Sequence, residues 1–171
     1  MKSLYLLWTV LLTSTLSFGQ IQSVSIQASG LTCSMCSRAI YKALEKVPNV
    51  SNVEEDIEHT SYHIQFKDPA VVSLENLKKA VTDAGFSVAW MEVNANFQNV
   101  EVAPDSSLRL NNLIFQFVDI HKQNLLGKKK LLVVDRDYLS DKDRKKYGAS
   151  YQSMPAAEGN GRIFHVTIRQ S

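Results

Sequence analysis

Hydrophobic side chains between residues 20 and 96 follow two spacings in turn. Apolar residues at every second position are typical of strands with one buried face, whereas apolar residues three and four apart form one face of a helix. Helical spacing occurs over residues 36–47, which Pro48 ends, and over residues 74–84, which Gly85 ends. Strand spacing occurs over residues 21–28, 62–66 and 86–93, and residues 50–57, where acidic residues separate the apolar ones, are interpreted as a further strand.

The order of these segments is strand, helix, strand, strand, helix, strand within about 75 residues. That order is typical of the ferredoxin-like α+β fold, in which a four-stranded antiparallel sheet carries two helices on one face. We therefore predict a ferredoxin-like domain over residues 20–96.

A β-rich pattern replaces this order after residue 96. Apolar residues either alternate or form a short buried-type run, which predicts strands. The segments concerned are residues 108–120, 131–134 and 162–169. We expect residues 97–171 to form a separate small β-rich domain, with its strands in a partly open barrel.

A charged helix and a loop are expected between the last two of these strands. The helix falls within residues 139–147, with Ser140 as its N-cap and Gly148 after its end. Residues 149–161 are rich in Gly, Ser, Pro and Ala, which predicts a loop.

Residues 1–19 resemble a secretory signal peptide. Lys2 precedes an apolar run over residues 4–12, and small residues stand at Ser17 and Gly19. This pattern predicts cleavage after Gly19. The apolar run is also shorter than the roughly 20 residues that a bilayer span needs. An uncleaved membrane anchor is the alternative. We expect an exported protein, periplasmic or secreted, with no stable membrane insertion after cleavage.

Charge is distributed unevenly along a chain whose net charge is only +2. Residues 20–96 hold six basic and nine acidic residues, and residues 97–171 hold twelve basic and eight acidic residues. The run from Lys128 to Lys130 reads as a solvated hairpin edge, with Asp135 and Asp137 close by in sequence. Because no basic stripe is interleaved with stacking aromatics, we predict no nucleic-acid partner.

Two cysteines, Cys33 and Cys36, carry the chemistry of the chain. Cys33 is expected in the loop after the first strand, and Cys36 in the first helical turn. The unpaired N–H groups and positive dipole of a helix start stabilise thiolates there, and Arg38 adds positive charge. Two soft thiolates suit Cu(I), with Hg(II) and Zn(II) as alternatives. A closed zinc site normally needs four ligands, and the chain has no second cysteine pair.

The segment from Gly30 to Cys36 resembles the metal loop of the heavy-metal-associated domain family. The family motif is Gly-Met-Thr-Cys-x-x-Cys, which Gly30, Thr32, Cys33 and Cys36 match. The sequence Asp-Ala-Gly-Phe at residues 83–86 is similar to the end of the family's second helix. The resemblance implies that the two cysteines bind Cu(I) and pass it by ligand exchange to a metal-transporting membrane protein or another partner. Mercury-binding periplasmic members of the family are also exported.

Two residues beside the predicted metal ligands depart from the family pattern. Leu31 replaces the usual methionine, which packs beneath the loop, and its similar volume predicts little loss. Phe86 stands where cytosolic copper chaperones carry lysine, and it either shields the site or is plain strand core. Together with Thr32, which matches the motif, these two residues are expected to support the cysteine ligands without binding the metal. Met35 could add a thioether ligand, but a solvent-exposed side chain is the simpler interpretation.

The histidines and one further methionine are weaker candidates for metal binding. We expect His59 and His63 on the surface, at the end of the sheet far from the metal loop. His121 has no partner at ligand spacing, and His165 is expected to face outward from its strand. Met154 lies in the expected loop, where an auxiliary copper ligand is a remote option.

A thiol–disulfide oxidoreductase is the alternative function, because Cys-x-x-Cys at a helix start also occurs in redox enzymes. Those enzymes place the motif opposite a cis-proline loop, for which none of the four prolines is an obvious candidate. No phosphate-binding loop or catalytic triad pattern is present, so we expect a binding protein and not an enzyme. A third possibility is that residues 97–171 dock to a transporter or envelope partner.

Overall fold

The six elements expected before residue 96 are present in the expected order in the computed structural model, which describes residues 19–31, 34–147 and 162–169. They are β1 (Gly19–Ser29), α1 (Ser34–Glu45), β2 (Val50–Asp56), β3 (Ser61–Phe66), α2 (Leu74–Asp83) and β4 (Ser87–Val102). The expected signal peptide lies outside the described residues apart from its last residue, and so do Gly148 and the loop expected over residues 149–161.

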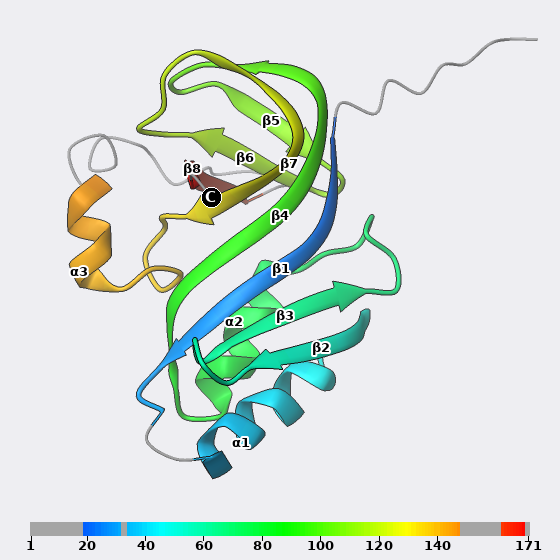
Figure 1. Cartoon of the computed structure of the whole chain (residues 1–171), viewed down its shortest axis with the longest axis vertical. Helices are drawn as coiled ribbons and strands as arrows, with labels where there is room; N and C mark the ends of the chain where they lie inside the picture. The colour runs from blue at the N-terminus through cyan, green and yellow to red at the C-terminus, as the bar shows by residue number, and fades with distance from the viewer. Residues whose placement is uncertain (1–18, 32–33, 148–161, 170–171) are drawn as a thin grey trace, which may run out of the picture.

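The first four strands form an antiparallel sheet in the order β2-β3-β1-β4. Helices α1 and α2 cover one face of it (Figure 1). Val24, Ile26 and Ile64 project into the core on that side and are inaccessible to solvent, and the hydroxyl of Tyr62 donates to the carbonyl of Ser37 in α1 at 3.1 Å. The ferredoxin-like α+β prediction is confirmed.

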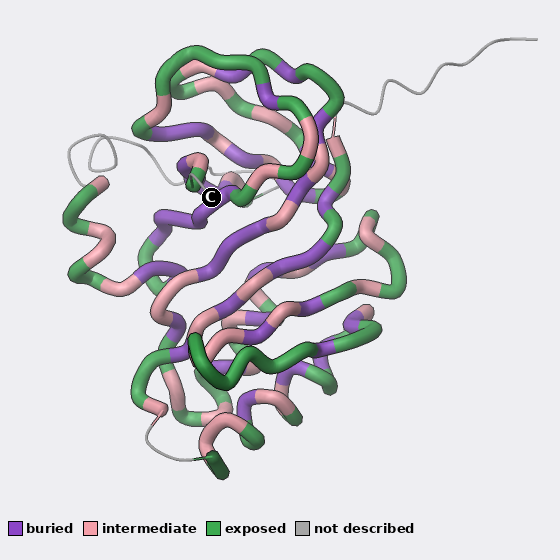
Figure 2. The backbone as a smooth tube through the Cα atoms, in the orientation of Figure 1, coloured by how far each residue is buried: buried purple, intermediate pink, exposed green. Residues whose placement is uncertain are grey.

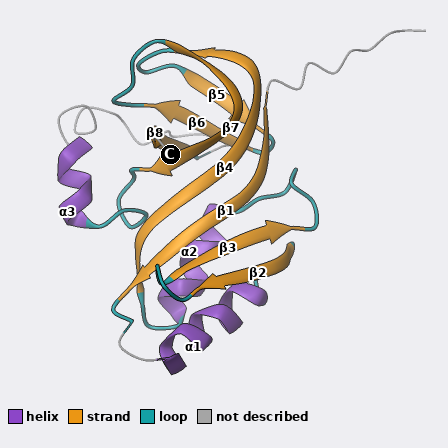
Figure 3. Ribbon diagram, viewed as in Figure 1, coloured by secondary structure: helices purple, strands orange, loops and turns teal. Residues whose placement is uncertain are grey.

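Four further strands extend the same sheet beyond β4. They are β5 (Ser107–Leu110), β6 (Leu113–Phe117), β7 (Gln123–Val133) and β8 (Ile163–Arg169). The complete order is β2-β3-β1-β4-β7-β8-β6-β5, and the β6–β8 pairing is parallel whereas the others are antiparallel (Figure 3). A hydrophobic core runs through both parts of the molecule, as the buried segments in Figure 2 show; its members include Leu44, Ile64, Leu77, Phe115, Leu125 and Phe164.

The boundary expected between residues 96 and 97 falls inside β4. The alternation of buried residues continues through Val93, Ala95 and Phe97 without a break, and β7 pairs with β4 from Glu92 to Val102. The polypeptide therefore passes from the ferredoxin-like part to the β-rich part within a single strand.

The sheet-rich part curls back toward β1 as a partly open barrel. The backbone N–H of Ile21 donates to the side-chain oxygen of Asn111 at 2.9 Å. A Cβ atom placed on Gly19 would lie 2.8 Å from a methyl carbon of Leu110. In the described residues β1 and β5 approach each other but share no ladder, so the barrel stays open at this seam.

The charged helix appears as α3 (Asp141–Arg144), continued by the short 3-10 helix η1 (Lys145–Tyr147). Ser140 is its N-cap as expected, because its hydroxyl accepts from the backbone N–H of Asp143. Strand β7 is much longer than the run expected over residues 131–134. The expectation was too short because the first residues of β7 are mostly polar and carry little hydrophobic signal.

His165 does not face solvent, contrary to expectation. Its side chain is only 8% exposed, as is that of Asp135. The backbone N–H of His165 donates to one carboxylate oxygen of Asp135 at 3.0 Å, and the ring Nδ1 lies 2.8 Å from the other. His165 shares its face of the sheet with Thr167, which stands opposite Leu132 of β7. Leu132 belongs to a second hydrophobic cluster with Val118, Val134 and Leu139, against which Tyr147 packs.

Candidate metal centre

The predicted metal loop joins the end of β1 to the start of α1. Ser29, the last residue of β1, pairs with Ser87, the first residue of β4. Gly30 follows with φ +86°, a left-handed conformation that glycine adopts without the steric penalty of a side chain. The loop therefore leaves the sheet at the end where α2 also returns to it. Thr32 and Cys33 lie outside the described residues.

Cys36 lies in the first turn of α1, as expected. Its side chain is half-buried, and this turn contains no acidic residue, whereas Arg38 lies two residues further on. The first N–H groups of a helix have no partner within the helix and carry its positive dipole end. The surroundings of Cys36 therefore favour a thiolate, the form that binds soft metal ions.

Leu31 and Phe86 both pack against the main hydrophobic core and are only partly exposed. Phe86 is held in place by the end of α2. Gly85 (φ +90°) donates its N–H to the carbonyl of Thr82 at 3.0 Å, and Phe86 donates to that of Val81 at 3.2 Å. This pair of bonds is the Schellman motif, which terminates helices and turns the next residue onto the core. Phe86 thus contributes to the core while lying at the metal-loop end.

Met35 points into solvent, with 80% of the residue exposed. Ile57, in the β2–β3 turn, is equally exposed. The interpretation of Met35 as a solvent-exposed side chain agrees with this placement. Groups of three or more His, Cys, Asp or Glu side chains at metal-binding distance are absent from the described residues.

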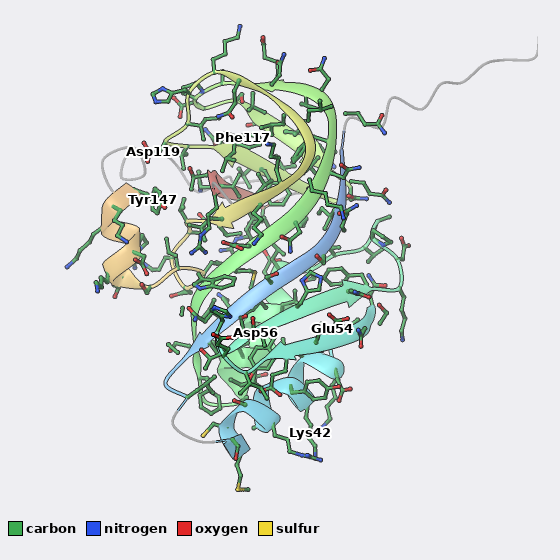
Figure 4. All side chains as sticks on the ribbon, in the orientation of Figure 1. Lys42, Glu54, Asp56, Phe117, Asp119 and Tyr147 are labelled. Carbon is green, nitrogen blue, oxygen red and sulfur yellow. The ribbon has the colours of Figure 1, made fainter. Side chains whose placement is uncertain are left out.

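The β2–β3 hairpin lies at the metal-loop end of the sheet, and the expectation that it lies at the far end is wrong. Strand β3 runs antiparallel to β1, so its first residue, Ser61, pairs with Gln27 near the end of β1. The side chain of Gln27 also donates to the carbonyl of His59 at 2.7 Å. Figure 4 shows Asp56, the last residue of β2, at this end of the sheet.

His59 and His63 occupy different surroundings. The ring Nδ1 of His59 lies 2.9 Å from a carboxylate oxygen of Asp56, and both side chains are largely exposed. The Asp56 carboxylate raises the pKa of His59, and hydrogen bonds from His59 lower the pKa of Asp56. His63 lies on the open face of the sheet, where its Nδ1 is 3.2 Å from the hydroxyl oxygen of Ser25. Sequence spacing alone did not indicate either pairing.

These features define a ferredoxin-like domain with a cysteine-containing loop at a helix start. The family model that matches the chain is that of the heavy-metal-associated domain, over residues 25–87. The chain belongs to this family. The match includes the metal loop and ends at the first residue of β4, so β5 to β8 lie beyond it.

Known relatives are similar to part of the chain. The mercuric transport protein periplasmic component of Pseudomonas fluorescens is 38% identical over 65 residues, which cover 38% of this chain and 70% of that protein. The copper chaperone CopZ of Staphylococcus epidermidis is 30% identical over 63 residues, covering 37% of this chain and 91% of that protein. The probable copper-transporting ATPase HMA5 of Arabidopsis thaliana is 28% identical over 93 residues, only 9% of its length.

One solved structure is similar to part of the chain. Oxidized MerP from Ralstonia metallidurans CH34 is 39% identical, covers 39% of this chain and 94% of its own, and has a TM-score of 0.36. Among the described residues, no helix is both long and apolar enough to span a bilayer.

Proposed function

We propose that this protein binds one soft metal ion, Cu(I) by preference, through Cys33 and Cys36 and delivers it to a protein partner. The observation that carries the proposal is the family match over residues 25–87, within which the motif from Gly30 to Cys36 leads into the first turn of α1. Mercury and copper proteins both appear among the relatives, so Hg(II) and Zn(II) remain the alternatives to test.

The chemistry of the two thiolates supports transfer as well as binding. Cu(I) is soft and accepts two sulfur ligands, which leaves it open to attack by a thiolate of the partner. Exchange of one thiolate for another moves the ion without any change in its oxidation state. Leu31 and Phe86 pack against the core next to the loop. Met35 is exposed at the start of α1, so a partner protein can approach the site from the solvent side.

We further propose that the protein works outside the cytoplasm without catalysing a reaction. The leader-like residues 1–19 and the periplasmic relatives support export. In an oxidising compartment two nearby thiols tend to close as a disulfide, so metal loading or a reducing partner has to compete with that closure. The partner is a metal-transporting membrane protein or another thiol-bearing metal carrier.

An anaerobic titration of the reduced protein with Cu(I), in the presence of a competing chelator, tests the proposal. We expect one equivalent to bind, and the double substitution Cys33→Ser with Cys36→Ser to abolish binding. Met35→Ala is the matched control, since its exposed side chain is not expected to be a required ligand. Retained binding in the double variant would overturn the proposal.

The same preparation separates metal binding from redox catalysis. A thiol–disulfide oxidoreductase would reduce insulin disulfides in the presence of dithiothreitol, and we expect no acceleration above the uncatalysed rate. Parallel titrations with Hg(II) and Zn(II) then rank the three ions.

A further inference from the structure

The lysine run from Lys128 to Lys130 lies within strand β7 and pairs with β4 along its whole length. On the other side of β7 the pairing with β8 begins at Lys130, so Lys128 and Lys129 have a strand neighbour on one side only among the described residues. The carboxylates nearest in sequence do not neutralise these lysines, because each has another partner: Asp135 with His165, Asp137 with Lys78, Asp141 with Arg144 and Asp143 with Lys146.

Positive charge is concentrated here within the described part of the chain. Lys130 stands directly opposite Arg169 across the β7–β8 pairing, and like charges at opposed positions destabilise a sheet. Arg169 is neutralised by the buried carboxylate of Glu92 and stacks on Trp90 at 5.4 Å. No ion pair between described residues engages any of the three lysines.

The lysines border a hollow of about 430 Å³ on the open face of the sheet, the face opposite α1 and α2. Side chains from β1, β3, β4 and β7 meet there. The described residues that line it are all polar and include no carboxylate: Gln22, Ser23, His63, Gln65, Asn94, Lys128, Lys129 and Lys130. A volume of this size falls in the range that small-molecule sites occupy.

A hydrogen-bonded ladder of polar groups from β1, β3 and β4 forms and supports the floor of the hollow. Asn94 donates through its amide to the hydroxyl oxygens of Ser23 at 3.1 Å and Ser25 at 3.0 Å. Ser25 in turn lies 3.2 Å from Nδ1 of His63. A Ser25 hydroxyl that accepts from Asn94 can donate its own proton to Nδ1, which leaves the Nε2–H of His63 as a donor. Ser23 is 4% exposed, so this floor is recessed.

We propose that this hollow binds a small ligand carrying two or more negative charges as carboxylate or phosphate oxygens. Lys128 and Lys130 supply the charge, while the hydroxyl and imidazole groups supply oriented hydrogen bonds. Charge-assisted hydrogen bonds are stronger than neutral ones, and a dianion engages both lysines at once. The site is separate from the metal loop and uses none of its residues.

Titration of the full chain with citrate, and separately with inorganic phosphate, at fixed ionic strength tests this site. We expect saturable binding of at least one of them with a Kd below about 1 mM. The double substitution Lys128→Gln with Lys130→Gln is expected to weaken binding at least ~10-fold, because it removes two charge-assisted contacts. Which anion binds more tightly distinguishes a carboxylate ligand from a phosphate ligand.

Three controls make the outcome decisive. Lys142→Gln with Lys145→Gln changes the net charge equally at exposed positions of α3 and η1, and it should leave binding within about 2-fold of the parent protein. Lys128→Arg with Lys130→Arg keeps the charge and should retain binding, which separates charge loss from misfolding. Cys33→Ser with Cys36→Ser should bind the anion normally, so failure of the metal proposal leaves this one intact.

Specific results would overturn the proposal. These are no saturable binding of either anion, an equal loss in the Lys142 and Lys145 control, or binding of an oligoglutamate peptide without binding of either small anion. The last result would assign the hollow to an acidic polypeptide.

Discussion

The family region and the sheet-rich region use one continuous sheet in two different ways. In the first, α1 and α2 close one face of β2, β3, β1 and β4. In the second, β5 to β8 curl back toward β1 and enclose a core among the strands themselves, while α3 and η1 lie outside. The predicted metal chemistry belongs to the helical region. The second region is therefore an extension of the fold through β4, and not a domain attached by a linker.

Substitutions in the two cores provide the largest expected effect and the sharpest test of this continuity. Phe115 and Leu44 are both inaccessible to solvent and belong to one hydrophobic cluster, from opposite regions. Phe115→Ala should lower the free energy of unfolding by about 3–5 kcal/mol and Leu44→Ala by about 2–5 kcal/mol. Because the sheet and core are shared, each variant should shift one cooperative transition, measured in urea by circular dichroism and Trp90 fluorescence.

Leu126→Ala serves as the control for these variants, since that residue is 68% exposed and the change should stay within about 0.5 kcal/mol. Two separated transitions, each sensitive to only one of the core variants, would show that the regions unfold independently. That result would contradict the continuity argued from β4.

The sequence predicted the family region well because its signals are local. Helical spacing, the glycine after α2 and the Gly30–Cys36 motif each involve residues close together in the chain. The placement of the β2–β3 hairpin was wrong because it depends on how β3 pairs with β1, and that pairing joins residues far apart in sequence. The same limitation explains the extent of β7, whose first residues are held by β4 and not by any hydrophobic pattern of their own.

In the candidate site, too, features set by neighbouring residues were predicted and features set by residues far apart in sequence were not. The sequence alone indicated Cys36 at the helix start, and the family resemblance indicated Phe86. Burial of His165 was not predictable by alternation, because the second hydrophobic cluster on its side of the sheet combines three other segments: Val118, Leu132 with Val134, and Leu139. The lysine hollow also escaped prediction, since its floor combines Ser23, His63 and Asn94 from three strands.

A smaller effect is expected at a hydrogen-bonded contact that joins the two regions away from the sheet. The side chain of Asn112, in the β5–β6 turn, accepts from the N–H of Val72 at 3.0 Å and donates to its carbonyl at 2.7 Å. Val72 is 1% exposed, so Asn112→Ala would leave buried backbone groups without these partners. We expect a loss of about 1–3 kcal/mol in the free energy of unfolding.

Asn124→Ala is the matched control for Asn112→Ala, because Asn124 is exposed and makes no side-chain hydrogen bond within the described residues. Its substitution should change the stability by less than about 0.5 kcal/mol. If the two variants were equally stable, the Asn112 contact would not contribute to joining the regions.

The smallest expected effect is a change in a histidine pKa, and it concerns one of two histidine–aspartate pairs, one in each region. The Asp56–His59 pair is largely exposed, whereas the side chains of the Asp135–His165 pair are each 8% exposed. Asp56 raises the pKa of His59 above its ordinary value of 6.5, and Glu58 contributes less in the same direction. Asp56→Asn should therefore return the His59 pKa toward 6.5, and Glu58→Gln should lower it by a smaller amount. An NMR titration of the His59 ring protons measures both shifts.

The directions of the two pKa shifts determine how the pair's contribution to stability changes with pH. A raised His59 pKa stabilises the hairpin fully below pH 6.5, and this contribution is lost as the pH rises through the raised value. The lowered Asp56 pKa contributes above pH 3.8 and is lost as the pH falls through the lowered value. Since salt screens exposed charges, about 1 M NaCl should reduce the His59 shift. A His59 pKa at its ordinary value in the unmodified protein would show that the Asp56 contact is not maintained in solution, and the contrast between the two pairs would then rest on burial alone.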